Sequence, residues 1–407
     1  MIHGVVAGVA AIALGAVAFR IRPAEADHLS ALVRPAAIIL AIPAVWFLIQ
    51  AIPIPGSGLA NPMWASASTA LGTPIMGRIS IDPGATLLSL IRYFSFIAIG
   101  LTATAVSIDR RRAEWILVWL IGVTSVTAGL LVVNNLGFIR LPVTGDDITL
   151  SAPIAAVSVL GTIVAACTAI RAVERYETRR TSKEMTFARF ARAFALCLVG
   201  LAICWLALSG RSAQLFAAAC GTVALVLIQV IRRLGLGRWT SAALAVAAII
   251  VASAVALNQQ NNVHDLTLRF AKGAPTATVS VAQRIMTDAS WAGSGAGTFS
   301  SLLPIYRDID ETAVYTVPTT AAAIAIELGR PLLLIGALTM IGAIVLLVRG
   351  ALRRGRDSFY PAAGACCAIA LTIEAFTDAT ALSTAPQIVA AAILGLALAQ
   401  SVSRTSQ

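Results

Sequence analysis

The run SAPIAAVSVLGTIVAACTAI, from Ser151 to Ile170, leads directly into RAVERYETRRTSKEMTFARFAR, from Arg171 to Arg192. The first stretch holds twenty residues without a charge, about the length that a helix needs to cross the hydrocarbon core of a bilayer. The second stretch holds seven basic residues and three acidic ones. An uncharged span that ends in a basic loop is typical of a membrane helix that finishes on the cytoplasmic side.

The same alternation recurs along the chain, and the composition agrees with it. Of the 407 residues, 58% are apolar and 12% are charged, whereas soluble proteins average about 45–50% and about 25%. This composition excludes a soluble enzyme, a disordered chain and a fibrous protein. We therefore predict an all-α polytopic integral membrane protein with about 11–12 transmembrane helices and one large periplasmic loop domain. The candidate spans are Val5–Phe19, Val33–Ile52, Pro83–Val106, Trp115–Val133, Ser151–Ile170, Ala191–Ser209, Ser212–Ile231, Trp239–Leu257, Leu332–Val348, Phe359–Thr377 and Pro386–Val402.

The net charge of +11 is concentrated in short segments between these spans. Of the 30 basic residues, 21 lie in six such segments, and acids outnumber bases in the rest of the chain. This is the positive-inside pattern of a polytopic membrane protein, and it argues against nucleic-acid binding. It places the N-terminus outside and the C-terminus in the cytoplasm. The first span, Val5–Phe19, has no basic residue before it and no small-residue cleavage site, so we do not expect a cleaved signal peptide.

Three segments on the predicted outer side are long enough to hold structure: Pro53–Asp82, Asn134–Leu150 and Asn258–Arg330. In the largest, Thr278–Ala289 has apolar residues at helical spacing, and Thr319–Leu328 predicts a short interfacial or re-entrant helix. Between them, three glycines predict a sharp turn rather than a nucleotide-binding loop, because the lysine of a P-loop is missing. The predicted division is a bundle of eight helices over 1–257, a periplasmic loop over 258–330 and C-terminal helices over 331–407.

The cysteines and histidines show no metal-binding spacing. All six cysteines fall in apolar runs, so we expect small apolar fillers at helix contacts or in lipid. The three histidines lie far apart in sequence. No metal site and no cofactor are predicted.

Nine basic residues remain outside the cytoplasmic segments, and eight of them are arginines: Arg78, Arg92, Arg140, Arg211, Arg269, Arg284, Arg307 and Arg330, with Lys272 as the ninth. An arginine on the outer face is not explained by topology. Its planar guanidinium binds phosphate oxygens in a bidentate way. These residues are therefore the candidates for binding an anionic head group.

Three of these arginines have competing interpretations. Arg211 interrupts two apolar runs and either clamps an anionic head group or sits at a helix end, which spacing alone favours. Arg284 either binds a ligand or pairs with Asp288 four residues later. Arg92 lies about half-way into the Pro83–Val106 run, so it needs a polar cavity or a carboxylate such as Glu374, as a structural pair or a site residue.

Several stretches together resemble the O-antigen ligase and polysaccharide polymerase superfamily of bacterial inner membranes, in particular its members from exopolysaccharide-producing alphaproteobacteria. The order of the motifs and their placement on the predicted outer face carry the resemblance, which covers the chain from about Asn61 to its C-terminus. The motifs are Asn61-Pro62-Met63-Trp64, Ser80-Ile81-Asp82-Pro83 with Tyr93, Leu208-Ser209-Gly210-Arg211-Ser212, Arg284 with Gly293-Ser294-Gly295-Ala296-Gly297-Thr298-Phe299 and Tyr306, Glu327-Leu328-Gly329, and Asp378 before Pro386.

The resemblance implies metal-independent, GT-C-like glycosyl transfer from an undecaprenyl-diphosphate-linked saccharide. The acceptor would be lipid A-core for a ligase, or another lipid-linked repeat for a polymerase. On this interpretation Arg211 and Arg284 match the two arginines that hold the diphosphate, and Arg92 is a third candidate. Fixed positive charge suits a departing diphosphate.

One departure concerns the catalytic base. The family places His-Asn nine and eight residues before the glutamate of Glu-Leu-Gly, and here those positions are Pro318 and Thr319. A general base contributes about 10²–10⁴-fold in rate, so its loss is severe unless another group replaces it. We rank Glu327 first and His264 second as replacements. The alternative is a non-catalytic membrane partner or carrier that binds a lipid-linked or anionic polysaccharide. A secondary transporter ranks third, because no internal repeat is present.

Overall fold

The computed structural model describes residues 2–54, 58–139, 143–144, 148–179, 187–235, 265–271, 274–306, 317–353 and 358–401. Within these ranges the chain is helical, apart from two short strands, β1 (Val143–Thr144) and β2 (Ile148–Thr149), that pair antiparallel. The predicted all-α class is confirmed for this part of the chain. The predicted span Trp239–Leu257 and the candidate base His264 lie outside the described residues.

Ten of the eleven predicted spans coincide with helices. The helices are α1 (Ile2–Arg20), α2 (Pro23–Ala51), α3 (Met63–Leu71), α4 (Pro83–Val106), α5 (Arg110–Asn135), α6 (Ser151–Arg179), α7 (Phe187–Ala207), α8 (Ser212–Leu234), α10 (Thr276–Asp288), α11 (Phe299–Tyr306), α12 (Thr320–Glu327), α13 (Arg330–Arg353), α14 (Phe359–Thr377), the 3₁₀ turn η2 (Thr380–Leu382) and α15 (Thr384–Ala399). Nine helices of the described chain are long and apolar enough to cross a membrane, and α15 is a shorter apolar helix. The prediction of 11–12 spans is therefore met in part.

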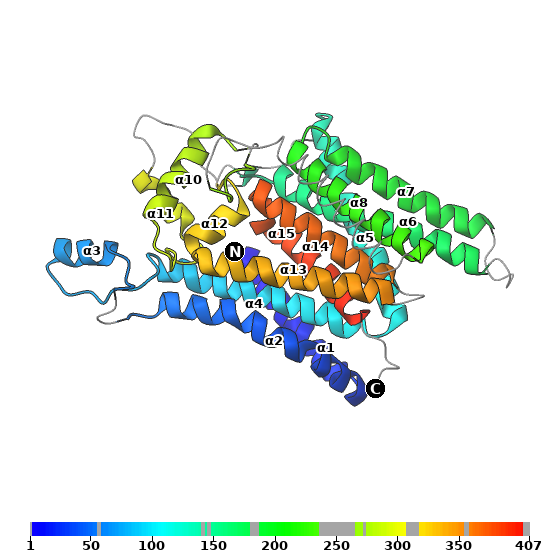
Figure 1. The fold of residues 1–407 in the computed structure, drawn as a ribbon, viewed down its shortest axis with the longest axis horizontal. Helices are drawn as coiled ribbons and strands as arrows, with labels where there is room; N and C mark the ends of the chain where they lie inside the picture. Colours follow the sequence, from blue (N-terminus) through cyan, green and yellow to red (C-terminus); the bar gives the residue numbers. More distant parts are fainter. Residues whose placement is uncertain are drawn as a thin grey trace.

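The bundle is centred on α6 and α14, which are the most buried of the nine spans. Figure 1 shows α5, α7 and α8 grouped around α6, with α4 and α13 along the other side of α14 and α15. The helices α4 and α15 lie in close contact, which requires small residues where they meet. A Cβ atom on Gly395 of α15 would lie 2.4 Å from the carbonyl oxygen of Gly100 in α4, so only glycine lets these two backbones approach.

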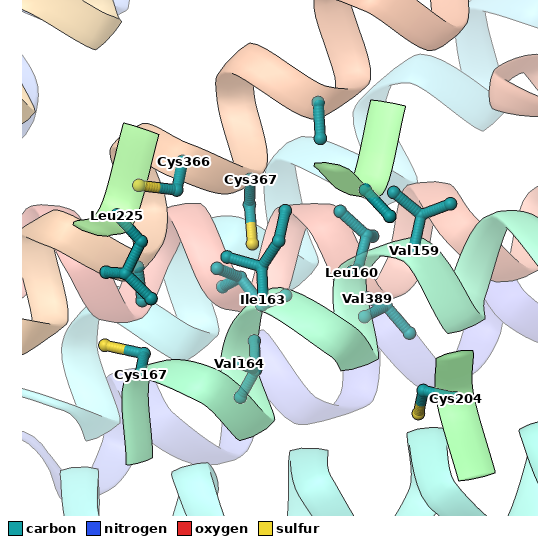
Figure 2. Close-up of a cluster of buried hydrophobic side chains, with 14 of the residues drawn as sticks. Val159, Leu160, Ile163, Val164, Cys167, Cys204, Leu225, Cys366, Cys367 and Val389 are labelled. Carbon is teal, nitrogen blue, oxygen red and sulfur yellow. The ribbon is translucent and has the colours of Figure 1, made fainter. Parts of the chain in front are cut away.

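The cysteines act as packing atoms in this core. Cys167, Cys204, Cys366 and Cys367 are buried among aliphatic side chains. Figure 2 shows Cys167 and Cys367 on either side of Ile163. All six cysteines are free thiols, and the prediction that they fill helix contacts is confirmed for these four.

The outside of the bundle is apolar. Large side chains such as Ile12, Ile38, Trp119 and Leu338 are each between 67% and 74% exposed. In water a surface of this kind drives aggregation, whereas lipid solvates it without cost. The described surface is therefore that of a membrane-spanning bundle.

The two ends of the bundle differ in content. At one end α10, α11 and α12 gather beside the start of α4 and of α13 (Figure 1). They share a hydrophobic cluster whose buried members, such as Leu268, Ile285 and Phe299, lie within residues 268–326, and Ile81 and Leu333 pack against it. At the far end of α4 the chain enters α5, where ion pairs join the basic segments that follow α4, α6 and α8.

Candidate functional site

The glycine loop, Gly293–Gly297, follows α10 in the sequence and leads into α11. In space it forms a tight turn that packs between the end of α12 and the start of α4. Gly293, Gly295 and Gly297 all have positive φ, at 79°, 108° and 76°. The N–H of Ser294 donates to the Ile326 carbonyl at 3.0 Å, and the N–H of Gly295 to the Glu327 carbonyl at 2.9 Å. A Cβ on Gly295 would lie 2.3 Å from the Oγ of Ser80. The prediction of a sharp turn that brings backbone close to another element is confirmed.

Glu327 ends α12 and points its carboxylate into this turn. Oε2 accepts the N–H of Gly297 at 2.8 Å, and Oε1 accepts the N–H of Phe299 at 3.2 Å, which is the first residue of α11. The carboxylate therefore caps the N-terminus of α11. Burial raises the pKa of Glu327, and it outweighs these two hydrogen bonds and the nearby Arg92 charge, which both lower it.

Arg330 lies three residues after Glu327, a spacing at which the sequence predicts an ion pair at the end of a helix, but it pairs with another acid. Its Nη2 is 3.6 Å from Oδ2 of Asp265. The reason is local: Gly329 has φ of 89°, so the helix is broken between the two residues and the three-residue helical spacing does not hold. The expected ion pair at the helix end is corrected accordingly.

Arg92 lies near enough to Glu327 for their charges to interact, although the two side chains form no ion pair in the described chain. Its charge acts on the Glu327 carboxyl and also on His3 of α1. The guanidinium lies 5.7 Å from the ring centroid of Phe96, and its buried Nε has no hydrogen-bond partner among the described residues. Glu374, which the sequence offered as a partner for Arg92, has Asp378 as its charged neighbour instead. Arg92 and Glu327 form what we call the Glu327 centre.

Arg211 lies at the opposite end of α12. It is the N-cap residue of α8, where a positive charge opposes the helix dipole. The alternative drawn from the sequence, an arginine that caps the C-terminal end of the preceding helix, concerns α7, which ends at Ala207. The charge of Arg211 lies near enough to interact with that of Asp378, the residue that follows α14, although the two side chains form no ion pair in the described chain. These two residues define the Asp378 centre.

Asp378 connects three elements. Its Oδ2 accepts from Nε2 of Gln214 at 2.9 Å, and its Oδ1 accepts the N–H of Thr380 at 3.2 Å. Its backbone carbonyl accepts the N–H of Thr320, the first residue of α12, at 3.0 Å. Burial raises the pKa of Asp378, against the lowering effects of these donors and of the Arg211 charge.

Beside the Asp378 centre lie buried side-chain oxygens that make no hydrogen bond within the described residues. Glu374, one turn earlier on α14, is fully buried, and neither carboxylate oxygen has a hydrogen-bond partner in the described part of the chain. The same holds for Oε1 of Gln214 and Oγ1 of Thr380. Sequence reasoning quoted Asp378 without placing it beside Arg211. The spacing of Glu374 to Asp378 and of Arg211 to Gln214, four and three residues, was the available signal.

The two centres are close because α12 is short. From Thr320 to Glu327 the axial rise is about 10 Å at 1.5 Å per residue. Arg284 differs from the other two arginines. It lies on α10, whose buried face includes Val281, Ala282 and Ile285, while its own side chain is exposed. The structure therefore brings Arg92 to Glu327 and Arg211 to the other end of α12, and leaves Arg284 on the surface.

The positions of the family His-Asn have structural roles here. Thr319 is buried, caps α12 by accepting the Ala322 N–H at 3.0 Å, and donates its hydroxyl to the Thr267 carbonyl at 2.7 Å. Lys272, Arg140, Arg307 and the acids Asp308, Asp310 and Glu311 lie outside the described residues. Within the described ranges, no three His, Cys, Asp or Glu side chains lie close enough to hold a metal ion.

An apolar cavity of about 370 Å³ lies beside the Glu327 centre. Nε1 of Trp46 donates to the Leu328 carbonyl at 2.9 Å, and its ring lies 6.5 Å from that of Trp291. The lining comes from α2, Trp291 and the start of α13: Ile38, Ala41, Ile42, Val45, Trp46, Ile49, Trp291, Pro331, Leu332 and Ile335. No polar side chain lines it other than the two indole rings.

No protein-family model matches the sequence, and no curated protein is similar enough to count as a match. The assignment of a function to this chain therefore rests on its own residues and on the geometry described above.

Proposed function

We propose that this chain is a bacterial inner-membrane glycosyltransferase that uses an undecaprenyl-diphosphate-linked saccharide in surface polysaccharide assembly, as a polymerase or an O-antigen ligase. The observation that carries the proposal is the pair of arginine–carboxylate centres at the two ends of α12, a helix with an axial rise of about 10 Å. Glycosyl transfer from a lipid diphosphate needs fixed positive charge for the leaving group and a carboxylate or imidazole for the acceptor proton.

The proposed orientation puts α10–α12 in the periplasm and the ion-paired ends of α5, α6 and α8 in the cytoplasm. The basic excess of the sequence supports it, because that excess lies in the segments after α4, α6, α8 and α13. The substrate saccharide would then meet both centres on the periplasmic side. A lipid carrier reaches them from the bilayer.

The proposed chemistry is a single displacement. The acceptor hydroxyl oxygen forms a bond to the anomeric carbon while the bond from that carbon to the diphosphate oxygen breaks. The hydroxyl proton passes to the base, and the electron pair leaves with undecaprenyl diphosphate. Arg211 holds the diphosphate, with Arg284 at the surface and Arg92 toward the bilayer as further contacts. Glu327 is the first candidate for the base, and burial raises its pKa, which makes the carboxylate a stronger base.

The apolar cavity supports a lipid-linked substrate. It opens between α2 and α13 and ends at Trp46, whose indole contacts the residue after Glu327. An isoprenyl chain has the chemistry to lie there, because the lining is aliphatic and aromatic. Tryptophans at the polar end suit the boundary between lipid and water.

A second candidate is a non-catalytic carrier or partner that binds a lipid-linked or anionic polysaccharide. Two observations favour it. Pro318 and Thr319 stand where the resembled family carries its histidine and asparagine, and Thr319 caps a helix there. Both oxygens of Glu327 are engaged by backbone N–H groups. A carboxylate that holds a loop together is less available to move a proton.

Transfer by purified protein in lipid, given an undecaprenyl-diphosphate oligosaccharide and a candidate acceptor, decides between the two. Arg211→Lys should reduce transfer by tenfold or more, because a point charge replaces a bidentate fork. Arg330→Lys is the matched control, since that side chain is 66% exposed and pairs with Asp265. Full activity of Arg211→Lys would remove the diphosphate clamp. Donor binding without transfer to any acceptor would favour the carrier.

A further inference from the structure

Three buried side chains from different elements have oxygen atoms without a hydrogen-bond partner in the described part of the chain, and all three lie beside Asp378. They are Glu374 of α14 with both carboxylate oxygens, Gln214 of α8 with Oε1 and Thr380 of η2 with Oγ1. Their exposed fractions are 0%, 2% and 8%. We call these three residues the oxygen cluster. Buried polar atoms are costly without a partner, so the cluster calls for a ligand.

Asp378 holds the members of the oxygen cluster in place. Nε2 of Gln214 donates to Oδ2 of Asp378 at 2.9 Å, which fixes the amide and leaves its Oε1 over. The N–H of Thr380 donates to Oδ1 at 3.2 Å. Glu374 lies one helical turn before Asp378, whose N–H donates to the Glu374 carbonyl at 2.8 Å, and the two carboxylates interact electrostatically. The unpaired oxygens are therefore grouped around one residue.

The charges around the cluster leave one negative charge unbalanced. Arg211 interacts with the charge of Asp378, while Glu374 has Asp378 as its charged neighbour among the described residues. Counting −1 for each carboxylate and +1 for the guanidinium leaves −1 when all three groups are ionised. The dipole of α14 adds partial negative charge, because that helix ends here at Thr377. A single positive charge would balance the region.

The chemistry of the unpaired atoms favours a small, hard cation. The four atoms are two carboxylate oxygens, an amide oxygen and a hydroxyl oxygen, with no nitrogen or sulfur among them. Oxygens of these kinds bind hard cations, and helix C-terminal ends coordinate sodium in membrane transporters. A divalent ion suits the cluster less well, because its acids number two and no three lie together in the described ranges. Burial this deep excludes a bulky organic ligand, whereas an ion needs a brief local opening.

We propose that the oxygen cluster binds one sodium ion, with the carboxylate of Glu374, Oε1 of Gln214 and Oγ1 of Thr380 as its ligands. The ion neutralises Glu374 and joins the end of α14 to the start of α8 and to η2. The site does not depend on the glycosyl-transfer proposal. Buried water, or a proton on Glu374, would satisfy the same oxygens without sodium, and the experiment separates these cases.

The test is thermal unfolding of the purified full-length protein, with choline chloride replaced by sodium chloride at constant ionic strength. The unfolding temperature of the wild type should rise by about 2 °C or more and then saturate, because the ion binds the folded state. Glu374→Gln should lose this rise. Its basal stability is compared with the wild type in sodium-free buffer, where it should be equal or higher. Glu177→Gln is the matched control, since it removes the same charge from a side chain that is 61% exposed and pairs with Arg233 at the other end of α8.

A milder variant and a second ion keep the proposal testable. Thr380→Val retains the shape of the side chain and removes a hydroxyl that has no hydrogen-bond partner in the described chain, so it should fold. The sodium concentration that gives half of the rise should increase about tenfold in this variant. Potassium should not reproduce the rise. An unfolding temperature that does not respond to sodium would overturn the proposal in favour of water or a proton. An equal rise in Glu374→Gln, or with potassium, would also overturn it.

Discussion

The two ends of α12 each hold a carboxylate beside an arginine, yet the two carboxylates are satisfied differently. Glu327 accepts two backbone N–H groups, one of them at the start of α11. Asp378 accepts from Gln214 and Thr380, and its neighbour Glu374 has no hydrogen-bond partner for either oxygen in the described chain. At the first centre both carboxylate oxygens are engaged, whereas beside the second centre buried oxygens have no donor in the described chain.

This difference distinguishes a carboxylate that stabilises the fold from one that is available to act on a ligand. A carboxylate whose oxygens cap a helix stabilises that helix, and this stabilisation is lost when the carboxylate takes a proton. A buried carboxylate without donors costs stability when ionised, and proteins keep such groups mainly at functional sites. The comparison therefore points to the Asp378 centre as the more reactive one, although sequence analysis ranks Glu327 first as the base.

The largest effect should come from Gly295→Ala in the loop that Glu327 organises. The new Cβ would lie 2.3 Å from the Oγ of Ser80, and the backbone φ of 108° is strained for alanine. We expect a loss of about 3 kcal/mol or more in unfolding free energy. Thermal unfolding in detergent measures it. Gly336→Ala, with nothing within 4 Å, is the control and should stabilise slightly. A stable Gly295→Ala protein would show that the loop is not closed.

Glu327→Gln should have the next largest effect. The amide keeps one acceptor oxygen, and its NH₂ group faces an N–H of either Gly297 or Phe299. The hydrogen bond that is lost is exposed at Gly297 or half-buried at Phe299, so the expected loss in unfolding free energy is about 0.5–1.5 kcal/mol. Denaturant unfolding at neutral pH checks this. Unchanged stability together with lost transfer would instead identify Glu327 as a catalytic residue with no structural role.

Glu374→Gln should have the opposite sign. The substitution removes a buried carboxylate and supplies an NH₂ group that can donate to Oε1 of Gln214 or to Asp378. We expect stability to stay equal or to rise by about 1 kcal/mol. The same unfolding measurement, run beside Glu327→Gln, makes the comparison direct. A clear loss of stability would mean that the Glu374 oxygens have donors in solution.

The smallest effect should be on the pH dependence of stability. Burial raises the pKa of Asp378, so the folded protein binds this proton more tightly than the unfolded chain does. Its contribution is greatest below the ordinary pKa of an aspartate and is lost as the pH rises through the raised value. Asp378→Asn should therefore flatten this decline of stability with pH between acid and neutral conditions. An identical slope in the variant would contradict the shift.

Helix positions could be predicted from the sequence where local chemistry decides them. The predicted spans Pro83–Val106 and Phe359–Thr377 agree with α4 and α14 residue for residue. The first begins where Asp82 accepts the Ala85 N–H, with Pro83 in the first helical position. The helix α3 was not predicted, because Met63–Leu71 is short and lies in a segment rich in glycine, proline and serine.

The sequence was enough to predict which residues belong to the site, but not which of them interact with one another. Arg92, Arg211 and Glu327 stood out because charges at apolar boundaries need an explanation. Their partners lie in other helices, and no spacing along the chain encodes which carboxylate meets which arginine. The nearest carboxylate in an apolar run, Glu374, was therefore the wrong partner for Arg92, and one glycine was enough to separate Glu327 from Arg330.

One buried amide determines how the α12 end of the molecule opens. Nε2 of Gln50 in α2 donates to the carbonyl oxygens of Ala292 and Glu327, each at 2.9 Å. A single side chain thus joins an early helix to both the glycine loop and α12. The amides of Ser294 and Gly295 should therefore exchange with deuterium at one shared slow rate, set by detachment of α2. Gln50→Ala should turn that shared opening into two faster, independent ones.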